Sequence, residues 1–145
     1  MSNQDQFTTY FREIQVKFSR IYAQLLSQAN VTLPQYALLS QLVSTGIIPM
    51  SEASKRLHLS KPAVTNLVDR LEQKKFLRRL PHSKDRRITL LEVQSSGEKL
   101  VHQIQEQILK FILKTLNQFS LKEQSIIIGF YSALLNNIGE FLTHK

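Results

Sequence analysis

Apolar residues recur every three or four positions near both ends of the chain, which is the spacing of one buried helix face. At the N-terminal end this pattern predicts a long helix over about residues 5–28. At the C-terminal end it predicts a helix that starts at Ser95 or Ser96 and ends near Asn117. A capping box at residues 120–123 then begins a last helix. The chain is therefore predicted to be helical at both ends.

The middle of the chain opens with a helix-start signal at Thr32, an N-cap candidate followed by a proline in the first turn. This helix is predicted to run to about Thr45, because Gly46 is a typical C-terminal residue. Residues 48–49 are predicted to form a connector, and residues 51–57 a short helix.

His58 and Leu59 interrupt the helical pattern, and Ser60 with Pro62 restarts it. Two helices joined by so tight a turn predict a helix-turn-helix. The second helix has an apolar stripe formed by Val64, Leu67, Val68 and Leu71. Its opposite face is small and polar, as a helix in the major groove of DNA requires, and carries Pro62, Thr65, Asn66 and Asp69.

After Phe76 the pattern favours short strands. Residues Leu77 to Leu80 and Arg87 to Val93 are predicted to form a two-stranded hairpin around a basic tip at residues 81–86. The predicted fold class is mainly α with a small β-hairpin, in which a winged helix-turn-helix is flanked by long terminal helices. The predicted organisation is a single domain over residues 1–145.

Positive charge is concentrated in one segment of the chain. Residues 51–90 contain eleven Lys or Arg and four Asp or Glu, a net charge of +7, whereas the other residues contain eight and seven. A charge excess confined to one segment is expected of a module that binds a polyanion.

The composition excludes several kinds of chemistry. The chain has no cysteine, so disulfides, thiolate metal sites and cysteine nucleophiles are excluded. We find no phosphate-binding glycine loop, no nucleophile elbow and no paired carboxylates of convincing spacing, so an enzyme is not expected and no cofactor is predicted. The histidines are scattered, and no metal site is predicted. Without a signal peptide or a long apolar run, we expect a cytoplasmic protein that does not bind membranes.

Residues from about Leu33 to Gly97 resemble the MarR family of bacterial transcription regulators. Residues 60–72 are similar to the family's recognition helix, and Asp85-Arg86-Arg87 is similar to its wing signature. The sequence departs from the family pattern at His58 and Lys75, where glycines are common, and both are expected to adopt left-handed backbone. It also departs at residues 53–54 and at Gln94, where Leu-Ala and threonine are usual.

The resemblance implies a regulator, acting as a repressor, that binds double-stranded DNA at a pseudo-palindromic operator. Ser60, Lys61 and Arg70 are expected to contact phosphates, because a helix N-terminus and basic side chains favour them. Pro62, Thr65 and Asn66 are the candidates for base edges. By resemblance, Arg86 enters the minor groove. Lys84 and Arg87 belong to the same basic tip, where Asp85 is expected to orient an arginine.

The resemblance also implies a homodimer, because one such domain makes few base contacts. Residues 31–93 would bind DNA, and residues 1–30 with 94–145 would form the dimerisation part, although some of their apolar residues must be intrachain core. A small aromatic effector is a further implied partner. The candidate interface residues are Phe7, Phe11, Ile14, Phe130, Leu134, Ile138 and Phe141.

An alternative interpretation is a winged helix that contacts an acidic protein and does not bind specific DNA. The basic residues at the wing tip argue against this interpretation. A basic membrane-surface protein is a weaker alternative, because the basic segment lacks an apolar face that could insert.

Overall fold

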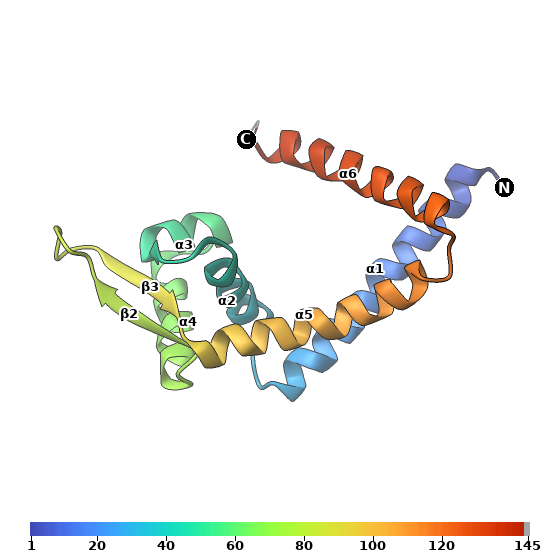
Figure 1. Cartoon of the computed structure of the whole chain (residues 1–145). Coiled ribbons are helices and arrows are strands. Elements are labelled where there is room, and N and C mark those ends of the chain that lie inside the picture. Colours follow the sequence, from blue (N-terminus) through green and yellow to red (C-terminus); the bar gives the residue numbers. More distant parts are fainter. Residues whose placement is uncertain (144–145) are drawn as a thin grey trace. The chain divides into compact units, whose positions relative to one another are not determined.

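The computed structural model of the protein describes residues 1–143, which form six helices and three strands (Figure 1). The chain divides into two compact units, Met1–Glu106 and Gln107–Lys145. In chain order, the elements are α1 (Asn3–Gln28), α2 (Leu33–Thr45), β1 (Ile48–Pro49), α3 (Met50–Leu57), α4 (Lys61–Gln73), β2 (Leu77–Pro81), β3 (Thr89–Val93), α5 (Ser95–Leu116) and α6 (Leu121–Thr143). The predicted fold class is confirmed.

Side-chain caps begin four of the helices, and three of them were visible in the sequence. Thr32 and Gln35 form a reciprocal capping box at α2. Ser120 and Glu123 do the same at α6. The Ser60 hydroxyl accepts a hydrogen bond from the Ala63 amide at the start of α4. Ser2 caps α1 with Asp5, so this helix begins two residues earlier than predicted.

The core of the first unit is centred on α2, α4 and the sheet, and α1, α3 and α5 also contribute buried side chains to it. Val64, Val68 and Leu71 of the predicted apolar stripe are at most 1% exposed, and Leu67 packs against them. Leu77 of β2 and Leu91 of β3 are fully buried. This packing fixes which face of α4 points outward, because the stripe occupies the inward face.

Among residues 1–143, three residues other than glycine have left-handed backbone, namely Asn30, His58 and Lys75. The sequence predicted His58 and Lys75, which end α3 and α4, and did not identify Asn30. In the turn between α3 and α4, the Ser54 hydroxyl donates to the Leu59 carbonyl at 2.5 Å. This bond explains a serine at the position where the family pattern has alanine.

The sheet differs from the predicted two-stranded hairpin in two ways. The connector at Ile48 and Pro49 is a third strand, β1, which pairs with β3 so that the strand order is β1-β3-β2. Strand β3 begins at Thr89, so Arg87 lies in the tip and not in the strand. Proline can occupy β1 because this strand is at the edge of the sheet.

The second unit consists of the last part of α5 and the whole of α6. Helix α6 is long and apolar enough to cross a membrane by length and composition, with a mean hydropathy of 1.3, and none of that window is buried within the chain. The sequence pattern predicted no such segment. Large exposed apolar surfaces of this kind mark sites of contact with a protein or a membrane.

Candidate nucleic-acid interface

Helix α4 presents the predicted contact residues on its exposed side. Ser60, Lys61, Pro62, Thr65, Asn66 and Arg70 are all exposed. The Thr65 hydroxyl donates to the Lys61 carbonyl at 3.0 Å. The Arg70 Nε donates to the Asn66 Oδ1 at 3.1 Å, which fixes the orientation of the Asn66 amide. The Asn66 Nδ2 remains available as a donor and its Oδ1 keeps a second lone pair.

The base of the wing and the start of α4 enclose a hollow of about 350 Å³. Its lining brings Lys61 and Thr65 of α4 together with Arg87 of the wing and Ser51 of α3. Two of the predicted tip residues, Lys84 and Arg86, do not line it and are exposed beyond it. The predicted site residues therefore lie in different places: Lys61, Thr65 and Arg87 line this hollow, whereas Lys84 and Arg86 of the tip and Arg70 of α4 lie outside it.

The wing tip is held by its own side chains. The His82 Nδ1 accepts hydrogen bonds from the backbone amides of Lys84 and Asp85, at 3.2 and 3.1 Å. The Asp85 carboxylate accepts from the Arg87 amide, Nε and Nη2 at 3.0 to 3.1 Å. The Arg87 side-chain and backbone hydrogen bonds hold the pKa of Asp85 below its ordinary value. The carboxylate therefore stays charged, and it restrains Arg87.

A second arginine joins the wing to α4. The Arg79 guanidinium of β2 donates to Glu72 Oε1 at 2.7 Å and to Asp69 Oδ1 at 2.5 Å. The Arg79 backbone amide donates to Glu72 Oε2 at 3.0 Å. Burial lowers the pKa of Arg79, but the hydrogen bonds to the two carboxylates outweigh this effect and raise it. We call Arg79, Asp69 and Glu72 the wing clamp.

The carboxylates of the basic segment are all engaged. Glu52 pairs with Arg56, Asp85 pairs with Arg87, and the remaining two belong to the wing clamp. Within residues 1–143, the cations that have no carboxylate within ion-pair distance include Lys61, Arg70, Lys84 and Arg86. These four are predicted contact residues, and their charge is available to an external anion.

The predicted dimer residues lie on two separate helices, each described within its own unit. On α1, Phe7, Phe11 and Ile14 are 52%, 47% and 49% exposed, and the Phe7 and Phe11 rings stack at 6.3 Å. On α6, Phe130, Ile138 and Phe141 are exposed, whereas Leu134 is half-buried.

Sequence reasoning missed the wing clamp and the role of His82. Asp69 was assigned to the outer polar face of α4 without a partner. The partner, Arg79, was counted only as part of the basic excess. The signal that could have found it is the i, i+3 spacing of Asp69 and Glu72, which places both carboxylates on one side of the helix.

Comparison with known proteins identifies relatives of the central part of the chain. Residues 31–89 match the model of the MarR family. The HTH-type transcriptional regulator FarR of Neisseria gonorrhoeae is 31% identical over 84 residues, which are 58% of this chain and 58% of FarR. The HTH-type transcriptional repressor MdtR of Bacillus subtilis is 33% identical over 88 residues, which are 59% of this chain and 57% of MdtR. The chain thus matches under two thirds of the length of these relatives.

Solved structures are similar over most of the chain. The transcriptional regulator Tm0710 of Thermotoga maritima has a TM-score of 0.75 and 26% identity, and the match covers 96% of this chain and 98% of Tm0710. RV1404 of Mycobacterium tuberculosis has a TM-score of 0.79 and 25% identity, with 94% of each chain covered. A MepR variant of S. aureus bound to an oligodeoxyribonucleotide has a TM-score of 0.71 and 24% identity, with 91% of this chain and 97% of MepR covered.

Proposed function

We propose that the chain is a transcriptional regulator of the MarR family, whose model its residues 31–89 match, and that it binds double-stranded DNA through α4 and the wing and controls transcription without catalysis of its own. The observation that carries this proposal is the set of cations without a carboxylate partner among the described residues, two of them on the exposed, small and polar face of α4 and two at the wing tip. Counterion release from neutralised phosphates would then supply much of the affinity.

The contacts divide by chemistry. Ser60 and Lys61, at the N-terminus of α4, bind phosphates together with Arg70. Pro62, Thr65 and Asn66 meet base edges, and Asn66 suits adenine because it can donate and accept at once. At the wing tip, Lys84 and Arg86 reach the DNA, with Arg86 in the minor groove. Arg87 binds a phosphate while Asp85 fixes its direction.

We further propose that the protein acts in the cytoplasm as a homodimer on a pseudo-palindromic operator. The exposed apolar residues of α1 and of α6 supply surface for a partner copy, and they include Phe11, Ile14, Leu135, Ile138 and Leu142. Recognition helices about 34–36 Å apart would match one turn of DNA. Repression, and its release by a small aromatic effector, complete the proposal. The description of MdtR as a repressor supports the first of these.

The test of DNA binding is a titration of the protein with its own upstream intergenic DNA and with an unrelated duplex at several salt concentrations. We expect tighter binding to the upstream DNA, and a steep fall of affinity with salt. Arg86→Ala should weaken binding about tenfold and lower the salt slope by about one. Arg12→Ala removes the same charge from α1 and should leave binding unchanged.

Equal, weak binding of both duplexes that neither variant changes would overturn the proposal and favour a winged helix that contacts an acidic protein. Sedimentation equilibrium tests the dimer separately. A dimer that Ile138→Glu converts to monomer supports the interface. A monomeric wild type that pellets with lipid vesicles would instead assign the apolar face of α6 to a membrane.

A further inference from the structure

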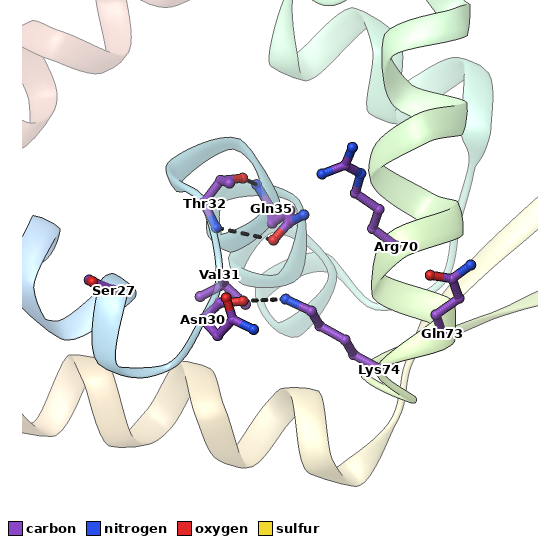
Figure 2. A pocket seen from close by; sticks show the side chains of 8 residues that line it. All are labelled: Ser27, Asn30, Val31, Thr32, Gln35, Arg70, Gln73 and Lys74. Atoms are coloured by element: carbon purple, nitrogen blue, oxygen red, sulfur yellow. Dashed lines mark hydrogen bonds between the residues drawn. The ribbon is translucent and has the colours of Figure 1, made fainter.

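A polar pocket lies within the first unit, on the side of α4 that faces the connection between α1 and α2 (Figure 2). It has a volume of about 610 Å³, which is within the range of small-molecule sites. Three elements contribute to its lining. The residues come from the end of α1, the connection to α2, the start of α2 and the end of α4, and they are Ser27, Asn30, Val31, Thr32, Gln35, Arg70, Gln73 and Lys74.

All the charged side chains of the lining are positive. Arg70 and Lys74 provide two cations, and the lining contains no carboxylate. The Arg70 Nε is bound to Asn66, so the two terminal nitrogens of its guanidinium are available. The Lys74 ammonium donates one hydrogen bond to the Asn30 carbonyl, which leaves two of its protons.

Gln35 is the most informative residue of the pocket because it is only 3% exposed. Its Oε1 accepts a hydrogen bond from the Thr32 amide at 3.0 Å, which fixes the orientation of the side chain. Its amide nitrogen therefore points away from the cap, and Figure 2 shows it on the side of Arg70. Within residues 1–143, this nitrogen donates no hydrogen bond. Because Ser40 Oγ is the only fully buried side-chain N or O atom without a partner among the described residues, Gln35 Nε2 keeps access to solvent, where an acceptor that enters the pocket can reach it.

We propose that this pocket binds an oxyanion, a phosphate or carboxylate group that accepts hydrogen bonds from Gln35 Nε2, the Arg70 guanidinium and the Lys74 ammonium. The positive end of α2 adds to the attraction. The group has two candidate sources, a free small molecule and a backbone phosphate of bound DNA. Its effect on DNA recognition rests on the proposed function, since Arg70 also holds Asn66.

The first experiment needs no DNA. Inorganic phosphate is titrated into the full-length protein at constant ionic strength, with chloride as the reference anion, and side-chain and backbone amide signals are followed by ¹⁵N NMR. We expect saturable shifts of the Gln35 side-chain amide and of backbone amides near Asn30 and Lys74. Shifts that stay linear, or that spread over all basic residues, would overturn the proposal.

Neighbouring lysines give a matched pair of variants. Lys74→Gln and Lys75→Gln each remove one positive charge from the same turn, but only Lys74 lines the pocket. Lys74→Gln should weaken phosphate binding about tenfold, the effect of losing one charged hydrogen bond. Lys75→Gln should change it by less than about twofold, because its charge is screened by solvent. Equal losses in both variants would reduce the site to general surface charge and overturn the proposal.

Gln35→Glu separates binding from folding. Glutamate is a normal capping-box residue at this position, so the acceptor for the Thr32 amide is kept. The free amide nitrogen is replaced by a carboxylate oxygen. The carboxylate repels an anion and pairs with Arg70 or Lys74 in the place of that anion. The variant should fold with unchanged helix content and lose phosphate binding. Retained binding in a folded Gln35→Glu protein would overturn the assignment.

A DNA titration distinguishes the two sources. If a DNA phosphate occupies the pocket, Lys74→Gln should lower the salt slope of DNA binding by about one relative to Lys75→Gln. If the source is a free molecule, both variants should bind DNA equally while only Lys75→Gln retains phosphate binding. Failure of DNA binding with a normal phosphate titration would count against the proposed function and not against the site.

Discussion

The same substitution, glycine to alanine, should have opposite effects at two places in this protein. A Cβ atom added at Gly97, in the first turn of α5, would lie 2.2 Å from the Phe76 carbonyl oxygen and 2.9 Å from its carbonyl carbon. Phe76 cannot easily move away. Its amide is bound to the Leu71 carbonyl, and its oxygen accepts from the Gln94 amide at 2.8 Å.

Relief of the clash requires a backbone shift of about 1 Å, judged from ordinary contact distances. Such overpacking typically costs about 1–3 kcal/mol, and a backbone neighbour places Gly97→Ala at the upper end. Alanine returns about 1 kcal/mol through helix propensity. The expected net loss is therefore about 2 kcal/mol, or a fall in Tm of roughly 4–8 °C for a chain of this size.

Thermal unfolding followed by far-UV circular dichroism measures this change. Gly129→Ala is the matched control, because a Cβ atom there meets nothing within 4 Å and only the propensity gain remains. It should raise Tm slightly. The scans are repeated at several protein concentrations, since Gly129 lies on α6, where dimer formation is proposed. A Gly97→Ala protein that melts at or above the wild-type Tm would refute the reasoning.

Three other predictions concern the turns and the wing. Lys75→Gly should raise the free energy of unfolding, measured by denaturant titration, by up to about 1 kcal/mol, because Lys75 has a φ of +61° at the end of α4. An unchanged free energy of unfolding would mean that this backbone is not strained. Asp85→Asn should weaken DNA binding although it removes a negative charge, because Arg87 loses its ion-pair partner. Glu98→Gln, distant in sequence, removes the same charge and should not weaken DNA binding. Tighter DNA binding by Asp85→Asn would contradict the role of the carboxylate. NMR titration should find the pKa of Asp85 below its ordinary value. The Asp85–Arg87 contact then stabilises the wing fully above the unfolded-state pKa, and this contribution is lost as the pH falls through the lower folded-state pKa. A pKa at or above the ordinary value would contradict this prediction.

Local signals explain why most helices were predicted from the sequence. The caps at Thr32, Ser60 and Ser120 depend only on residues within one helical turn, and each is present in the structure. The left-handed backbone at His58 and Lys75 follows from the same short-range pattern. Helix α4 of the candidate site was therefore placed correctly, with its apolar stripe inward.

Features that depend on distant residues were not predictable in this way. Strand β1 has two residues, and only its pairing with Leu90 and Leu91 makes it a strand. The beginning of β3 shifted to Thr89 because Asp85 binds Arg87 and folds it into the tip. The pocket around Gln35 is formed by segments about forty residues apart in sequence, and no periodicity brings them together.

The wing clamp links the two DNA-contacting elements of the proposed interface. Asp69 and Glu72 hold Arg79 of β2, while Asn66 and Arg70 lie bonded to each other on the same helix. Helix α4 is thus tied to the wing through one pair of residues and presents the other pair to solvent. Because Arg79 is bonded through both its side chain and its backbone amide, a displacement of α4 would carry the base of β2 with it. An oxyanion held by the terminal nitrogens of Arg70 would act on Asn66 through the Nε bond that these two residues share, so base recognition should respond before the wing does.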